Sequence, residues 1–250
     1  MSFNWKQILI VACNILVGIY LVLAVTAFNS PDEAMVKECT EVKIDIEKES
    51  MEGFLNPGEV KKLLSQHKLY PLSQPMSTIS PRKMEETLMK SPFIEKAECY
   101  KTLSGHVCIG IKQRIPVIRV MADNGDSYYL DNHGNIMPQA GYATDILIAT
   151  GHISKKYAQN TLSKVANHIV GSSFWRNQAV QLNVLPNGTL EMVPRVGEHI
   201  VFLGSPTHID NKLERLRKFY IYGLNKAGWN KYNYINMEFN NQIICKRNNR

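Results

Sequence analysis

The chain has 250 residues, of which 44% are hydrophobic and 20% are charged, a composition typical of a globular protein with one large or two small domains. Its formal net charge of +7 comes from scattered basic residues, with one tight cluster at 246–250. A nucleic-acid-binding surface needs a stripe of Lys and Arg with interleaved aromatic residues, so the charge pattern argues against nucleic acid as a partner.

Near the N-terminus, residues 8–28 form an uncharged apolar run of about 21 residues. As a helix, this run would span roughly 30 Å, the thickness of the hydrocarbon core of a bilayer. Lys6 precedes the run, whereas Asp32 and Glu33 follow it, so the positive-inside rule predicts a cytoplasmic N-terminus. The alternative is a signal peptide cleaved after Val25–Thr26–Ala27. The run is longer than an h-region of roughly 7–15 residues, which favours an uncleaved anchor.

A small unit with the element order β-α-α-β-β is predicted after this run. Asn56 and Glu59 form a capping-box pattern around Pro57, and Ser80–Pro81 gives a second helix start. Two helices over one face of a three-stranded sheet can bury a core within about 75 residues. The strands are expected at 42–46, 94–103 and 107–112, the last two forming a hairpin that closes at 104–105.

A corner at Gln113–Pro116 follows this hairpin. Pro116 has no backbone N–H, so it cannot donate to the ladder of a sheet. The apolar pattern then resumes over 116–121. One strand system is therefore expected to leave one sheet and enter another here, which makes Gln113, Arg114 and Pro116 the candidate domain-junction residues.

The rest of the chain predicts a mixed β-domain with two helices. Apolar residues at helical spacing predict helices over 154–170 and 208–224, whereas 142–151 shows no clear pattern. Turn clusters and alternation predict the strands at 116–121, 128–131, 180–185, 189–193, 199–203, 234–239 and 242–245.

Four cysteines lie beyond the apolar run: Cys39, Cys99, Cys108 and Cys245. They allow three pairings, and only Cys99 and Cys108 flank a predicted turn. The predicted register places Cys99 opposite Gly110 and Cys108 opposite Lys101, so the two sulfurs would be diagonal to each other. Four unpaired thiols are therefore the favoured interpretation.

Catalytic and ligand-binding motifs are missing from the sequence. It has no Cys-x-x-Cys, no His-Glu-x-x-His, no Gly-x-Ser-x-Gly and no phosphate-binding loop. His133 lies in a polar turn, and Asp131, at the end of a strand, is expected to accept hydrogen bonds from turn amides. We therefore expect no enzymatic activity, no metal and no cofactor.

Three motifs carry a resemblance to a known family: Gln-Arg-x-Pro-Val at 113–117, Tyr-Tyr-Leu-Asp at 128–131 followed by Gly134, and Tyr-Ile-Asn-Met-Glu-Phe at 234–239. In order and spacing, the chain resembles the FtsQ/DivIB family of bacterial division proteins. The resemblance implies an α+β fold with a single N-terminal transmembrane helix, a POTRA domain (β-α-α-β-β) and a mixed β-domain with two helices. The implied segments are a cytoplasmic tail (1–7), the transmembrane helix (8–28), a linker (29–40), the POTRA domain (41–114), the β-domain (115–247) and a tail (248–250).

The resemblance also implies a function. Members of the family are non-enzymatic scaffolds of the inner membrane, with most of the chain periplasmic, that link early and late division proteins at the septum. Partners of the FtsB and FtsL type add a strand to an edge of the β-domain. Phe239 would be the main contact at that edge, and Glu238 replaces the basic residue of some members. The matching residues are Phe239, Asn241, Gln242, Ile243, Ile244, Cys245, Lys246 and Arg247.

Three alternatives remain open at this point. Ile243 and Cys245 could instead face the core, as strand residues commonly do. The POTRA-like unit could belong to an envelope protein that assembles or transports polypeptides, although such proteins normally add a membrane barrel, for which this chain has no room. A membrane-tethered envelope hydrolase would require a cleft with a carboxylate or histidine of perturbed pKa.

Overall fold

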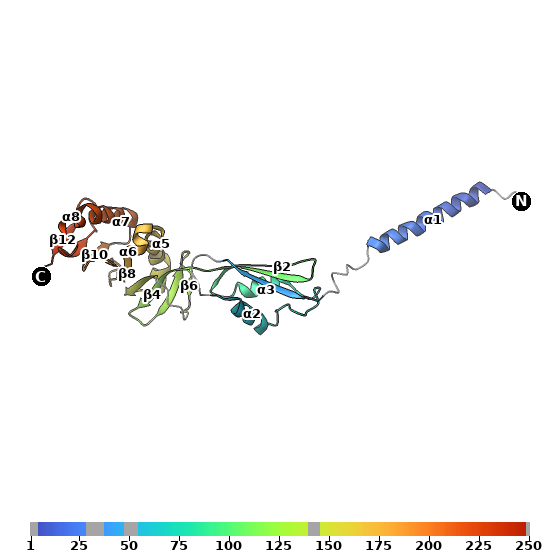
Figure 1. Cartoon of the computed structure of the whole chain (residues 1–250), viewed down its shortest axis with the longest axis horizontal. Helices are drawn as coiled ribbons and strands as arrows, with labels where there is room; N and C mark the ends of the chain where they lie inside the picture. Colours follow the sequence, from blue (N-terminus) through green and yellow to red (C-terminus); the bar gives the residue numbers. More distant parts are fainter. Residues whose placement is uncertain (1–4, 29–37, 48–54, 140–145, 249–250) are drawn as a thin grey trace.

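The computed structural model describes residues 5–28, 38–47, 55–139 and 146–248. Within these residues the strands form two sheets, one of three strands and one of nine. Figure 1 shows helices α2 and α3 beside the small sheet, and α5 to α8 on one side of the large one. The expected tails (1–7 and 248–250) and linker (29–40) lie partly outside the described residues.

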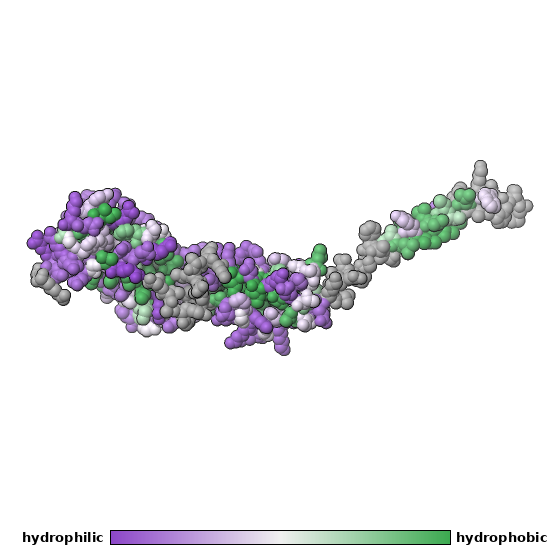
Figure 2. Space-filling model, viewed as in Figure 1, coloured by the Kyte–Doolittle hydropathy of each residue, from purple (hydrophilic) through white to green (hydrophobic). Residues whose placement is uncertain are grey.

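Helix α1 (Trp5–Phe28) contains 24 residues and includes most of the apolar run. Its described large hydrophobic side chains, from Trp5 to Val25, are all exposed, and Figure 2 shows a mainly hydrophobic surface there. Among the helices in the described part of the chain, none combines the length and the hydropathy needed to cross a membrane.

The predicted order β-α-α-β-β is confirmed by the small sheet and its helices. The elements are β1 (Glu41–Ile46), α2 (Pro57–Gln66), α3 (Pro81–Leu88), β2 (Ile94–Lys101) and β3 (His106–Gln113). β3 lies in the centre, parallel to β1 and antiparallel to β2. Because β1 and β3 are far apart in sequence, the helices provide the crossover that a parallel pair requires.

Both predicted helix caps are confirmed. Asn56 accepts a hydrogen bond from the amide of Glu59 at 3.0 Å, and the Glu59 carboxylate accepts one from the amide of Asn56 at 3.0 Å. Ser80 Oγ accepts from the amide of Lys83 at 3.4 Å. These caps orient the helices so that Leu64 and Leu88 are fully buried against the sheet.

The predicted register of the hairpin is wrong by one residue. Cys99 lies opposite Ile109, and Tyr100 lies opposite Cys108. The loop has three residues rather than two, because Thr102 bonds with His106 and Gly105 adopts a φ of 84°, the geometry of a three-residue hairpin loop. Cys99 is consequently buried in the core while Cys108 is on the opposite face, and all five cysteines are free, as the favoured interpretation predicted.

The large sheet has the strand order β12-β11-β10-β9-β8-β7-β4-β5-β6. Two of its strands, β6 and β7, were not predicted; β7 lies in the segment without a clear pattern and pairs in parallel with both β4 and β8. The strands are β4 (Pro116–Ala122), β5 (Ser127–Asp131), β6 (Ile136–Met137), β7 (Leu147–Gly151), β8 (Ala179–Val184), β9 (Leu190–Pro194), β10 (Ile200–Gly204), β11 (Tyr232–Asn236) and β12 (Ile244–Arg247).

Helices cover one face of this sheet, and the prediction of two helices is incomplete. The first predicted helix comprises α4 (Lys155–Tyr157), a π-helical turn η2 (Ala158–Leu162) and α5 (Ser163–Gly171). The second comprises α7 (Ile209–Lys218), a π-helical turn η3 (Phe219–Leu224) and α8 (Asn225–Ala227). The helix missing from the prediction is α6 (Ser173–Gln178), which is too short to show a helical period in the sequence. Ser172 caps its N-terminus, and its Trp175 side chain is buried in the core.

A buried histidine lies in the core beneath the second helix. His199 is 2% exposed, and its Nε2 lies 2.7 Å from the hydroxyl of Tyr220, while Trp229 stacks on its ring. Its Nδ1 has no hydrogen-bond partner among the described residues. Burial lowers the pKa of His199, since the charged imidazolium would lose its hydration.

This pKa shift predicts a loss of stability in mild acid. The unfolded histidine binds a proton below a pH of about 6.5, whereas the folded one stays neutral to lower pH. The free energy of unfolding is therefore unaffected by this group above that pH and decreases below it. His199→Phe should therefore reduce the difference between the thermal midpoints at neutral and mildly acidic pH by a few degrees. The same change at the exposed His152 should leave that difference as in the parent, and an equal effect of both changes would contradict the prediction.

Candidate functional site

Strand β12 forms one edge of the large sheet. It pairs antiparallel with β11, with Ile235 opposite Cys245 and Asn236 opposite Ile244. It is the last strand of the nine-strand order, so no described strand lies on its outer side. An edge of this kind presents main-chain N–H and C=O groups that an added strand can pair with.

Side chains at positions 243–246 alternate between the core and solvent. Ile243 and Cys245 pack against the core cluster, as the alternative interpretation of these two residues predicted. Burial also raises the pKa of the Cys245 thiol, which keeps it protonated and unreactive. Ile244 is 47% exposed, and Lys246 is exposed beside it on the same face of the strand. Side-chain contact with a partner is therefore available from Ile244 and Lys246, with Arg247 exposed at the end of the strand.

The first part of the expected edge is not a strand. β11 ends at Asn236 rather than at Phe239, because the Asn236 side chain accepts a hydrogen bond from the amide of Glu238 at 2.8 Å and starts a turn. Phe239 and Asn241 lie in this turn, with Phe239 46% exposed. β12 begins only at Ile244, so the predicted strands at 234–239 and 242–245 are both shifted.

A groove separates this turn from α7 and η3. Arg215 lines it and donates from Nη2 to the carbonyl of Gln242 at 2.9 Å. Tyr222 and Ile243 line it, and its volume is about 500 Å³. The groove is open to solvent and lies directly beside the start of β12, so a chain bound at the edge could extend into it.

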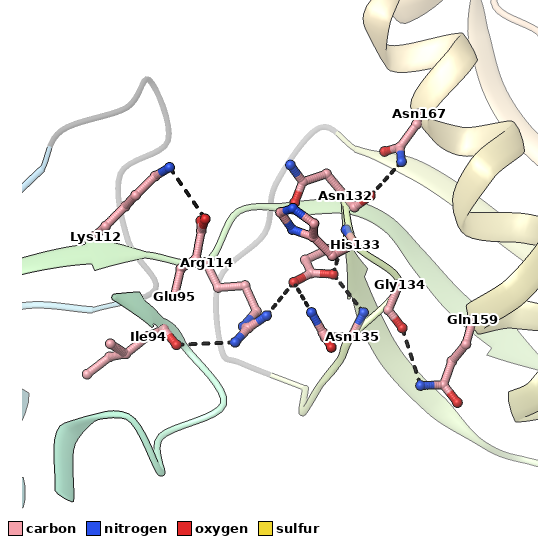
Figure 3. Close-up of polar contacts among 11 residues, drawn as sticks. Ile94, Glu95, Lys112, Arg114, Asn132, His133, Gly134, Asn135, Gln159 and Asn167 are labelled. Carbon is pink, nitrogen blue, oxygen red and sulfur yellow. Dashed lines mark hydrogen bonds and ion pairs between the residues drawn. The ribbon is translucent and has the colours of Figure 1, made fainter. Parts of the chain in front are cut away.

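The corner between the sheets is held by Arg114. β3 ends at Gln113, which is buried, and β4 begins at Pro116, opposite Asp131. The Arg114 amide donates to the carbonyl of Phe93 at 2.8 Å. Its guanidinium donates to Asp131 Oδ2 at 2.5 Å and to the carbonyl of Ile94 at 3.3 Å (Figure 3). One side chain thus bonds to both the small sheet and the large one.

Asp131 receives four hydrogen bonds although it is fully buried. Besides Arg114, its carboxylate accepts from the amides of His133 at 2.9 Å and Asn135 at 2.7 Å, and from the Asn135 side chain at 2.9 Å. Burial alone would raise the pKa of Asp131, but the hydrogen bonds from Asn135 and Arg114 outweigh it and lower that pKa. The carboxylate is therefore ionised and paired, with no capacity left for proton transfer.

The turn that follows Asp131 is also hydrogen-bonded to the helices on the sheet. Asn167 donates to the carbonyl of Asn132 at 2.6 Å, and Gln159 donates to that of Gly134 at 3.3 Å (Figure 3). Gly134 has a φ of 81°, and a Cβ there would lie 2.6 Å from the Gln159 carbonyl oxygen. Only glycine allows this approach of the turn to the helix. Through these hydrogen bonds, the corner, the turn and the helix form one connected polar network.

Sequence reasoning identified part of this network. The bonds from turn amides to Asp131 were predicted, whereas its pairing with Arg114 was not. The sequence did contain a signal for this pair: Arg114 follows one predicted strand and the oppositely charged Asp131 ends another. In the described residues, no group of three or more His, Cys, Asp or Glu side chains could hold a metal ion.

Removal of the Asp131 carboxylate should destabilise the protein strongly. Asp131→Ala would leave the half-buried Arg114 guanidinium without its carboxylate partner and two turn amides without an acceptor, a loss of about 3 kcal/mol in the free energy of unfolding. Denaturant unfolding provides the measurement. The exposed ion pair of Asp126 and Lys155 offers a control, since Asp126→Ala should cost less than about 1 kcal/mol. Similar losses in the two variants would contradict the assigned role.

Comparisons with known proteins agree with the division of the strands into two sheets. A POTRA-like domain model matches residues 37–112, and the family model described as FtsQ/DivIB, C-terminal related, matches residues 115–246. A search of curated proteins finds no match to the chain. Since the second model covers more than half of the chain, the chain belongs to the FtsQ/DivIB-related family of proteins, with a POTRA-like domain before the family domain.

Proposed function

We propose that this protein is a non-enzymatic scaffold of the bacterial division machinery that binds small FtsB- and FtsL-type partners by strand addition at β12. The observation that carries the proposal is the open edge of β12, at the end of the nine-strand sheet, within a domain of the FtsQ/DivIB-related family. Gln242 to Arg247 would form the binding edge, and Phe239 and Asn241 would contact the partner from the preceding turn.

The chemistry of this edge suits a peptide strand. A four-residue edge strand offers about two N–H and two C=O groups on its free side. Those bonds supply affinity without selecting a sequence, so specificity must come from side chains. Ile244 offers an apolar contact, and Lys246 and Arg247 favour an acidic segment on the partner.

We propose further that residues 8–28 anchor the protein in the inner membrane, with the bulk of the chain periplasmic and concentrated at the division septum. The support is the uncharged run in the full sequence together with the family match. The described apolar side chains of α1 are exposed, and an exposed apolar helix requires a nonpolar environment. The domain limits that go with this proposal are 41–114 for the POTRA-like domain and 115–247 for the β-domain.

Substitution of the exposed contacts at this edge should weaken partner capture. Ile244→Lys removes an apolar contact and places like charge beside Lys246, so a loss of about ten-fold or more in affinity for FtsB/FtsL-type partners is expected. Phe239→Lys should act in the same direction. Affinity is measured by pull-down and titration with the full-length protein in detergent.

Ile221→Lys is the matched control for these variants. Ile221 is 38% exposed on η3 and does not line the groove beside β12, so this change should leave capture unaltered. All three variants should keep the circular dichroism spectrum and thermal midpoint of the parent. Undiminished capture by Ile244→Lys and Phe239→Lys would place the interface elsewhere.

A fluorescent fusion tests the cellular role. The fusion should concentrate at midcell in dividing cells, and the Ile244→Lys fusion should still reach the envelope but lose the partner proteins from its complexes. A uniform distribution of the parent fusion around the envelope would argue against a role in division.

A further inference from the structure

The most exposed large hydrophobic side chain that the structure describes is Leu103, at 90%. It is the first residue of the three-residue loop that closes the β2–β3 hairpin. At this exposure the leucine packs against little of the domain, and the hydrogen bonds that shape the loop come from Thr102, Ser104 and Gly105.

A second exposed leucine lies on the neighbouring loop. Leu72 is 42% exposed, and the next residue, Ser73, donates from its amide to the carbonyl of Cys39 at 2.8 Å. The Cys39 amide donates to the carbonyl of Gln74 at 2.8 Å. These two hydrogen bonds hold loop 71–76 against Cys39, which lies just before β1.

The hairpin loop is fixed on the other side of the same short segment. The amide of Thr40 donates to the carbonyl of Gly105 at 3.0 Å. Lys101 connects the two loops directly, since its Nζ donates to the carbonyl of Met76 at 2.5 Å. The two exposed leucines therefore belong to one end of the small domain, where the chain enters it at residues 39–40.

This end is opposite to the corner. β2 and β3 run the length of the small sheet, and Figure 1 shows their connection at the end of the sheet remote from β4. Eleven residue steps separate Cys39 from Phe28, the last residue of α1. Even a fully extended chain of that length spans at most about 40 Å, so this end cannot move far from the end of α1.

The side chains around the leucines suit the boundary between lipid and water. Tyr100 is 58% exposed on the strand that leads to the hairpin loop, and a tyrosine can place its ring among lipid headgroups. Polar side chains lie behind the loop, where Nδ1 of His106 is 3.5 Å from the carboxylate of Glu41. Apolar residues at the tip with polar and aromatic residues behind them are the arrangement found in segments that insert shallowly into a bilayer.

We propose that the tip formed by Leu72 and Leu103 inserts into the interfacial layer of the membrane that holds α1, on the periplasmic side. This inference depends on the proposed membrane anchor and adds a second, reversible lipid contact to it. The tip would hold the small sheet upright on the membrane, so that the corner and the edge of β12 project away from the lipid.

Lipid quenching of the full-length chain in nanodiscs of phosphatidylethanolamine and phosphatidylglycerol tests this contact. An environment-sensitive fluorescent amino acid is placed at Leu103, at Val17 within α1, or at the exposed Lys90 near the corner end of the small domain. Nitroxide-labelled lipids should reduce emission about two-fold or more at Leu103 and at Val17, and should leave Lys90 unaffected.

The three positions separate this inference from the proposal on which it depends. Quenching at Val17 without quenching at Leu103 would overturn the lipid contact while the anchor stands. The absence of quenching at Val17 would refute the anchor itself. With the probe at Leu72, the Leu103→Asp variant should lose most of the quenching seen in the parent, and undiminished quenching there would contradict insertion of the tip as a unit.

Discussion

The ion pair between half-buried Arg114 and fully buried Asp131 is the interaction on which the relation between the two sheets depends. Burial of the Asp131 carboxylate without partners would be costly, and its complete set of hydrogen bonds makes the arrangement stable. Asp131 satisfies a turn of the large sheet and Arg114 holds a strand end of the small one, so neither sheet completes its polar bonds alone. The corner at Gln113–Pro116 is thus explained by hydrogen bonding, in addition to the missing donor of Pro116.

Elements whose structure depends on residues near in sequence could be predicted, whereas elements that depend on distant strands could not. The caps at Asn56 and Ser80 and the buried stripe of α7 depend on neighbours within one or two turns, and the structure confirms them. β7 receives its partners from strands distant in sequence, so pattern reasoning missed it. The hairpin register failed through one residue of loop length, which is enough to exchange the faces of a strand.

At the candidate site, too, only the features set by local sequence pattern could be predicted. The position of the last strand could be approximated from alternation, and the inward direction of Ile243 and Cys245 was an open alternative that the structure supports. The start of β12 could not be predicted, because it depends on a side-chain bond within Asn236–Glu238 and on the tie from Arg215 to Gln242. The Arg215–Gln242 bond joins residues 27 positions apart, whose proximity is known only after the sheet has formed, whereas the Asn236–Glu238 bond is local.

The parallel pairing of β1 with β3 has a mechanical consequence. The chain enters β1 from the side of α1 and leaves β3 toward the large sheet, so a pull between these two points acts along both strands in opposite directions. Such a load falls on all the hydrogen bonds between them together, in shear, rather than on one bond after another. A domain connected in this way resists extension far better than a hairpin opened from its ends.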